Sequence, residues 1–247
     1  MPTRKAIIIT SPGVSPNYPN FLAGVVRDGQ NFSAYLLSAI GGAWTQDEIK
    51  TFHNPSVEEL YGEFNYTNVD YLVVYFAGHG SHNGAQTLLQ INPLYSVGET
   101  NLVGCAKRKL TIIDACRVKV QRGLGLGDPL HESQKIQKYI DRKIARTLYD
   151  QAIFNAPLEN HTLYACAVGQ TAKESSVEGG YFTSALLKSS LLRTPRKHEV
   201  LTVGESASLA AQTMIDQGIE PSNQQVCVTS QTITFPFAVH PKLPEFA

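Results

Sequence analysis

The sequence predicts an α/β fold, with an open and mostly parallel central sheet that has helices on both faces. Short, uninterrupted apolar runs such as 71–76 and 110–113 are typical of strands that are covered on both sides. Segments with apolar residues at helical spacing alternate with these runs along the chain. The chain has 247 residues, 43% of them hydrophobic, and no internal repeat or clear boundary, so we expect a single domain over 1–247.

The first half of the chain supplies three strands and two helices. Residues 6–10 form an apolar run that ends at Ser-Pro-Gly, which indicates a strand before a turn. Apolar residues recur at helical spacing over 22–40, and the Asn-Pro-Ser at 54–56 is a typical helix start. The run 71–76 is a buried strand stopped by a glycine, and 86–91 is a shorter strand.

The second half continues the alternation. Residues 110–113 form another buried strand, and the glycine-rich segment 123–127 lies within a predicted mobile linker over about 118–134. Isoleucine and leucine at spacings of four predict a long helix over about 131–153, and 163–168 is a further central strand. The remaining predicted elements are helices at 182–192 and 203–215 and strands at 225–228 and 232–239.

Charge and cysteine content exclude several classes of protein. Basic and acidic residues number 21 each, so no overall charge attracts nucleic acid or an anionic membrane. No apolar run has the length of a signal peptide core or a membrane span, so we expect a cytoplasmic protein. The four cysteines contain no C-x-x-C pair, and we expect free thiols.

Two residues with catalytic chemistry follow the ends of buried strands. His79 lies between two glycines after the run 71–76, and Cys116 follows the run 110–113. Parallel strands end at the same edge of a sheet, which is where open α/β sheets place their sites. Although 37 residues separate His79 and Cys116 in sequence, this topology can bring them together.

A thiol and an imidazole at one edge fit nucleophilic catalysis. Cys116 attacks a carbonyl as the thiolate, and His79 accepts the thiol proton and later protonates the leaving amine. The N–H groups of Gly80 and Cys116 are the candidates for an oxyanion hole. We expect no metal, because two ligands without closely spaced companions make a poor zinc site. A nucleotide-binding fold is disfavoured by the first turn, SPGVSPNYP, which lacks the required glycine pattern.

The two strand-end segments resemble those of the caspase-like clan. The sequences AGHGS and DACR around His79 and Cys116 are similar to the catalytic motifs of bacterial metacaspase-like proteins. Two other stretches in the same order agree with this family: LAGVVRD at 22–28 and the glycine-rich segment ACAVGQTAKESSVEGGYFTSALL at 165–187. The resemblance spans about 5–190. It implies the caspase-like fold, with a central six-stranded, mainly parallel sheet, and cysteine endopeptidase activity on protein or peptide substrates.

The resemblance also implies a substrate pocket. In metacaspases, acidic residues at the positions of Asp28 and Asp114 line the S1 pocket. Two carboxylates would favour arginine or lysine at P1. Three alternatives stay open: a structural hydrogen-bonding role for both aspartates, a peptidase with another P1 preference, and a catalytically silent caspase-like interaction module.

Calcium, self-cleavage and activation are the remaining expectations. The segment Ser81–Gly98 has no acidic residue, unlike the corresponding region of calcium-dependent metacaspases, so we expect no calcium requirement and no cofactor. Members of the clan are often cut after the nucleophile, which predicts self-cleavage at Arg117, Lys119 or Arg122; an uncut loop is the alternative. No sensor domain is obvious, so a separately encoded activator or effector target is plausible.

Overall fold

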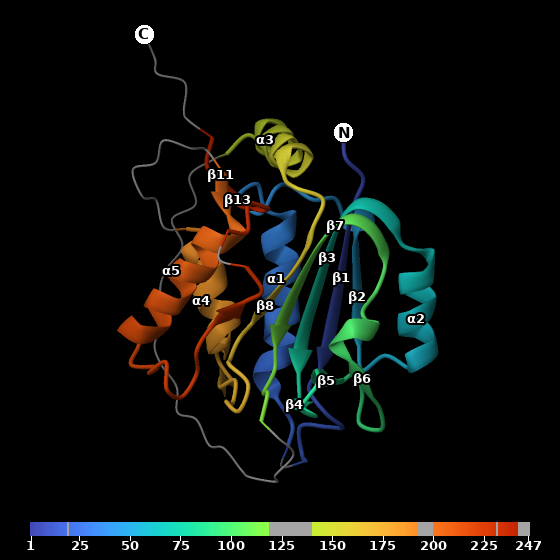
Figure 1. Cartoon of the computed structure of the whole chain (residues 1–247), viewed down its shortest axis with the longest axis vertical. Helices are drawn as coiled ribbons and strands as arrows, with labels where there is room; N and C mark the ends of the chain where they lie inside the picture. The colour runs from blue at the N-terminus through green and yellow to red at the C-terminus, as the bar shows by residue number, and fades with distance from the viewer. Residues whose placement is uncertain (19, 119–139, 192–199, 231, 242–247) are drawn as a thin grey trace.

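The computed structural model describes residues 1–18, 20–118, 140–191, 200–230 and 232–241. Its centre is a six-stranded sheet with the strand order β12-β8-β7-β3-β1-β2 (Figure 1). All pairings in this sheet are parallel except that of β12 with β8. The predicted fold class is confirmed. The six strands are β1 (Arg4–Ser11), β2 (Ile49–His53), β3 (Asn68–Gly78), β7 (Cys105–Asp114), β8 (Asn160–Tyr164) and β12 (Cys227–Val228).

Side chains alternate between the two faces of the sheet and build two cores. One core contains Ile8 and Tyr75, and the other contains Ile7 and Phe76. Because both faces are buried, the strand sequences are continuously apolar. The first core is covered by α1 (Ala23–Leu37), α3 (Arg142–Asn155), α4 (Tyr181–Ser189) and α5 (Val203–Asp216). The second core is covered by α2 (Val57–Tyr66) and the small sheet that follows β3.

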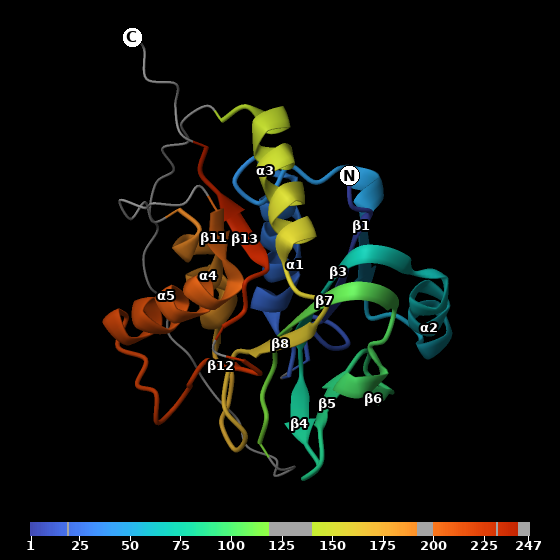
Figure 2. The ribbon, with the colours of Figure 1, turned by 45° about the horizontal axis from the view of Figure 1, so that its top comes forward.

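In the part of the chain that the structure describes, three small sheets accompany the central one. A three-stranded antiparallel sheet lies beyond the C-terminal end of β3 (Figure 2). Its strands are β4 (Gly80–His82), β5 (Thr87–Gln90) and β6 (Ser96–Gly98). The two others are β9 (Glu174–Ser175) with β10 (Gly179–Gly180), and β11 (Val200–Thr202) with β13 (Pro236–Val239).

Several predicted elements have different bounds or places. The strand expected at 86–91 is β5, which belongs to the three-stranded antiparallel sheet and not to the central sheet. The central sheet instead contains the exposed edge strand β2, which was not predicted from the sequence. The strand expected at 163–168 is β8, which ends at Tyr164. The helix expected from 131 begins only at Arg142, because the Asp141 side chain accepts the N–H groups of Lys143 and Ile144 and caps the helix there. Residues 131–139, and the predicted linker beyond Val118, lie outside the described residues.

Within the described ranges, no helix is long and apolar enough to cross a membrane.

Local signals define other helix starts. At α2, the Ser56 hydroxyl accepts the N–H of Glu59 while the Glu59 carboxylate accepts the N–H of Ser56. This reciprocal cap is why the helix begins directly after the Asn-Pro-Ser segment.

Candidate active site

His79 and Cys116 follow two neighbouring strands in matched register. β3 and β7 are parallel, and Ala77 is the partner of Asp114 near the ends of both strands. His79 and Cys116 each lie two residues beyond this pair. The register therefore brings both residues to the C-terminal edge of the sheet, as predicted.

The segments that follow the two strands are in direct contact. A Cβ atom added to Gly80 would lie 2.7 Å from both the Cys116 carbonyl oxygen and the Ala115 Cβ. Only glycine allows the two backbones to approach so closely. Slightly further on, the N–H of His82 donates to the carbonyl of Val118 at 3.0 Å. The two amides proposed for an oxyanion hole, those of Gly80 and Cys116, thus belong to segments packed against each other.

The loop between β1 and α1 orients the His79 ring. His79 Nε2 lies 2.7 Å from the carbonyl oxygen of Asn20. A carbonyl oxygen only accepts hydrogen bonds, so Nε2 carries a proton in this arrangement. Nδ1 is then the nitrogen that can accept the proton of a thiol.

Cys116 is a half-buried thiol in a resting arrangement. Its Sγ donates to the carbonyl oxygen of Ala172 at 3.6 Å, and no hydrogen bond joins it to His79. Burial raises the pKa of Cys116, and the negative charges of Asp114 and Glu174 add to this rise. To reach the His79 imidazole, Sγ would have to turn away from Ala172. Catalytic contacts that tighten only with substrate are common in free enzymes.

Arg117 anchors the segment that carries Cys116. It is buried, its guanidinium carbon lies 3.8 Å from the centre of the Tyr164 ring, and its Nε donates to the Thr87 hydroxyl at 3.1 Å. These contacts join the cysteine segment to β8 and β5. They disfavour Arg117 as a self-cleavage residue, because its side chain would have to leave this site to enter a substrate pocket. Lys119 and Arg122 lie outside the described residues.

Asp28 and Asp114 meet at the turn before α4. Both carboxylate oxygens of Asp28 accept the N–H of Gly180, at 3.0 and 2.8 Å. Asp114 Oδ2 accepts both the hydroxyl and the N–H of Thr183, at 2.7 and 3.2 Å. A Cβ on Gly180 would overlap the Asp114 carboxylate and lie 3.1 Å from that of Asp28. The two carboxylates therefore converge on one glycine and have structural partners as well.

Burial and mutual repulsion make these two carboxylates poor acids. Burial raises the pKa of Asp114 to about 6. Burial also holds the pKa of Asp28 well above its usual range, and the charge of Asp114 raises it further. Shifts of this kind favour binding of a cation, which would relieve the repulsion.

Glu174 is a third carboxylate beside Asp28 and Asp114, and its presence there was not predicted from the sequence. It lies in β9, where burial raises its pKa to about 7 and the charge of Asp114 contributes. Its Oε2 is buried without a hydrogen-bond partner. The N–H groups of Gly24 and Val25, at the start of α1, interact with the carboxylate and oppose the rise. The sequence does contain one signal for this role. Glu174 lies in the glycine-rich segment that follows a central strand, at the same edge of the sheet as Cys116.

Comparison with known proteins bears on the family and the fold of the chain. The family model of the caspase domain matches residues 3–238, nearly the whole chain. The chain belongs to the caspase family of cysteine peptidases. Among solved structures, the caspase domain described here is similar to caspase-1 from Spodoptera frugiperda, with a TM-score of 0.58 and 18% identity over 93% of this chain and 86% of that chain. This likeness confirms the caspase-like fold. No curated protein matches the sequence significantly.

The other cysteines of the caspase domain are not paired. All four cysteines are free thiols, as predicted: Cys105 is exposed, Cys166 is buried and Cys227 is half-buried. Among the residues described, no three or more histidine, cysteine, aspartate and glutamate side chains are grouped so that they could hold a metal ion. The ends of β3 and β7 therefore bring together the Cys116 thiol, the His79 imidazole and three nearby carboxylates. A second, buried thiol lies beside them, since Cys166 donates to the Ala115 carbonyl at 3.3 Å.

Proposed function

We propose that this chain is an endopeptidase that uses Cys116 and His79 as a catalytic dyad and cleaves after arginine or lysine. The observation that carries the proposal is the register of β3 and β7, which places both residues two positions beyond the paired Ala77 and Asp114. Membership of the caspase family supports the cysteine peptidase chemistry. The metacaspase-like subtype is part of the proposal and rests on the acidic residues beside the nucleophile.

The geometry supports a two-stage hydrolysis. His79 Nδ1 takes the thiol proton, and the Cys116 thiolate attacks the carbonyl carbon of the scissile peptide. The oxyanion that forms accepts hydrogen bonds from the backbone N–H groups of Gly80 and Cys116. His79 then protonates the leaving amine, and water hydrolyses the thioester with the same imidazole as base. The Asn20 carbonyl stabilises the imidazolium that exists between these steps.

The three carboxylates support a basic P1 residue. Asp28, Asp114 and Glu174 are mostly buried and influence one another electrostatically. Glu174 Oε2 has no donor in the resting structure. A guanidinium carries five N–H donors and a full charge, so it can serve several carboxylates at once. An aspartate at P1 would add a further negative charge to a group that already repels itself.

A peptide panel that varies only at P1 tests the proposal. We expect cleavage after arginine and lysine, none after aspartate, and no cleavage by the Cys116→Ala variant. Rates should be the same with a strong chelator and with added calcium, because the described residues offer no cluster for a metal ion. Cleavage after aspartate or leucine alone would reject the assignment of the three carboxylates but keep the dyad. Activity that a chelator abolishes and calcium restores would reject the expected independence from calcium.

The Glu174→Gln variant should be more stable than the wild type at alkaline pH. The pKa of Glu174 rises from 4.5 in the unfolded chain to about 7 in the fold, so the folded state holds the proton more tightly. The stability that protonated Glu174 contributes is therefore fully present below about pH 4.5 and is lost as pH rises through 7. Allowing for solvent screening, we expect a gain of about 1–2 kcal/mol in the unfolding free energy of the variant at pH 8. Urea titrations at pH 8 and pH 4.5 check this; a gain of equal size at both pH values would contradict it.

Self-cleavage after Lys119 or Arg122 also belongs to the proposal, with an uncut chain as the alternative. Both residues are basic, as the three carboxylates would require, and follow the nucleophile closely in sequence. We expect the wild type to yield two fragments whose masses identify the cut, while Cys116→Ala stays intact. An intact wild type that cleaves arginine peptides would reject self-cleavage and leave the peptidase assignment standing.

A further inference from the structure

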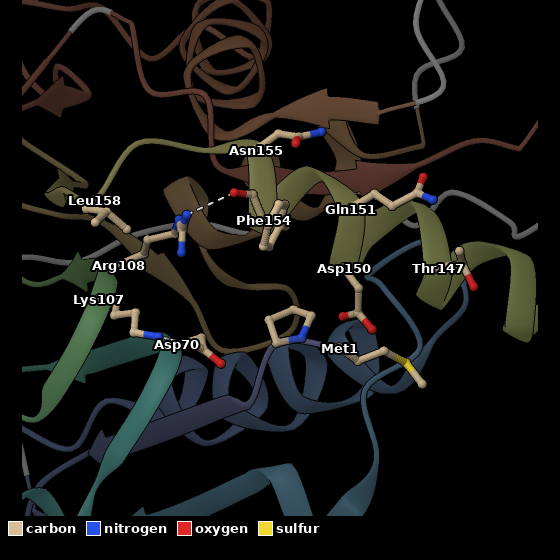
Figure 3. Close-up of a pocket in the computed structure, with 11 residues that line it drawn as sticks. Met1, Asp70, Lys107, Arg108, Thr147, Asp150, Gln151, Phe154, Asn155 and Leu158 are labelled. Atoms are coloured by element: carbon tan, nitrogen blue, oxygen red, sulfur yellow. Dashed lines mark hydrogen bonds and ion pairs between the residues drawn. The ribbon is translucent and has the colours of Figure 1, made fainter.

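A cavity of about 730 Å³ lies at the edge of the sheet opposite His79 and Cys116. It is lined by residues at the beginning of the chain, near the starts of β3 and β7, and on α3 (Figure 3). The volume is within the range of small-molecule sites, about 300–1,000 Å³. Nothing in the proposed peptidase mechanism uses this cavity.

Arg108, on β7, forms part of the cavity wall and caps the end of α3. The residue is 8% exposed. Its Nε donates to the Ala156 carbonyl at 2.8 Å, and its Nη2 donates to the Phe154 carbonyl at 3.0 Å, a bond drawn in Figure 3. Carbonyl groups at the end of a helix have no partner within it, so Arg108 supplies donors that α3 lacks.

Part of the Arg108 guanidinium remains free. A guanidinium carries five N–H groups, and the helix end takes one from Nε and one from Nη2. Nη1 has no hydrogen-bond partner, and it is not closed to solvent. The free N–H groups of Nη1 and Nη2 lie side by side at the end of the guanidinium. Such a pair matches the two oxygens of a carboxylate.

The charged neighbours of Arg108 on the strands are paired with each other. Lys107 donates to one oxygen of Asp70 at 2.7 Å, and the other oxygen accepts the N–H and the hydroxyl of Thr3. Among the residues that the structure describes, no carboxylate pairs with Arg108. The helix end beside it carries only about half a negative charge, so the guanidinium is not neutralised.

Asp150 also lines the cavity, but it does not offset Arg108. Arg4 and Arg146 lie 3.4 and 3.9 Å from its carboxylate, and both also pair with Glu48. Two arginines and two carboxylates make this group neutral. Both carboxylate oxygens of Asp150 are closed to solvent, so a ligand in the cavity meets Arg108 and not this carboxylate.

The charge that remains in the cavity is positive. The paired groups cancel, which leaves the single charge of Arg108. The ammonium group of Met1 acts on Asp150 and adds to the positive side, although the count is positive without it. Buried charges in proteins are normally paired, so one negative charge on a ligand would supply the partner that Arg108 lacks.

The rim of the cavity is apolar. Phe154, whose carbonyl accepts from Arg108, is 74% exposed, and Leu158 is 68% exposed. A ligand with an apolar body can cover this surface while its charged end reaches the guanidinium.

We propose that this cavity binds a small monoanion in which a carboxylate is joined to a flat apolar body. The carboxylate accepts the free N–H groups of Arg108, and the body packs against Phe154 and Leu158. A dianion such as phosphate would exceed the single unpaired charge and meet the carboxylate of Asp70. A cation would be repelled by Arg108. The proposal does not depend on the peptidase assignment.

Benzoate is the probe, and benzamide is the matched neutral compound of nearly the same shape. Titrations of the full-length, nitrogen-15-labelled protein followed by NMR should show saturable benzoate shifts at the Arg108 Nε–H and around Phe154. We expect benzamide to bind at least about tenfold more weakly, the effect of losing the charge in two hydrogen bonds. Equal affinity of the two compounds, or no saturable shift with benzoate, would overturn the proposal. Shifts confined to the surroundings of His79 would place the anion at the other edge of the sheet and reject the cavity.

Variants locate the binding site. Arg108→Met should weaken benzoate at least about tenfold. If the loss of the helix cap unfolds this variant, Phe154→Ser gives a second test, since it removes an exposed ring and should weaken benzoate about fivefold. Ile144→Ser, at a half-exposed position of α3 that does not line the cavity, should keep wild-type affinity. Benzoate binding that Arg108→Met and Phe154→Ser leave unchanged but Lys107→Met abolishes would place the anion on the exposed lysine and reject the proposal.

Discussion

The Cys116→Ala variant is expected to lose peptide hydrolysis, with kcat/KM lowered by at least about 10⁴-fold. Cys116 follows β7 at the edge where His79 follows β3, and alanine offers no atom that can attack a carbonyl. The fold should tolerate the change, because the hydrogen bond that Sγ donates to the Ala172 carbonyl is long, at 3.6 Å, and alanine keeps the Cβ atom. Initial rates on an arginine peptide measure the loss, and the thermal unfolding midpoint verifies the fold.

Matched variants separate the nucleophile from a general effect of thiol removal. Cys105→Ala changes an exposed cysteine at the start of β7, far along the strand from the site, and should keep full activity. His79→Ala should lower kcat by about 10²–10⁴-fold, the usual range for loss of an acid–base group. It should also slow alkylation of Cys116 by iodoacetamide near neutral pH, since burial raises the pKa of the thiol. If Cys116→Ala keeps its activity and Cys105→Ala loses it, the nucleophile is Cys105 and the assignment of Cys116 is wrong.

The strands that end before His79 and Cys116 could be predicted because both of their faces are buried. β3 and β7 carry continuous apolar runs into two separate cores, as is typical of parallel strands that are covered on both faces. The edge strand β2 has exposed residues at three of five positions, so its sequence carries no such signal. Strands of two or three residues, such as β6 and β9, are too short for any periodicity to be recognised.

The parts of the site that sequence did not predict depend on the paths of loops. The acceptor for His79 is a backbone carbonyl, that of Asn20, and no residue type signals where a carbonyl points. Glu174 acts beside Asp114 only because the segment after β8 returns to the start of α1, where Gly24 and Val25 meet its carboxylate. Asp28 and Asp114 were predicted from family resemblance. Their convergence on Gly180 is a property of the folded chain.

The Asp114→Asn variant should lower kcat/KM for arginine peptides by about 30- to 1,000-fold, the effect of removing one partner from a buried charge pair. Asparagine has the same shape and can still accept the hydroxyl of Thr183, so the local structure should persist. The sharpest comparison is a peptide with citrulline at P1, which has the shape of arginine without its charge. We expect the preference for arginine over citrulline to collapse in the variant.

Asp70→Asn is the matched control for this change, because Asp70 pairs with Lys107 at the opposite edge of the sheet. It should leave the ratio of arginine to citrulline cleavage unchanged. An equal loss on both peptides in Asp114→Asn would mean that the carboxylate supports the nucleophile segment through Thr183 rather than the P1 side chain. A selective loss on arginine, combined with a stability gain at alkaline pH in Glu174→Gln, would mean that the buried carboxylates trade stability of the free enzyme for recognition of a cation. Their raised pKa values already point in that direction, since each carboxylate is costly to ionise until a positive charge arrives.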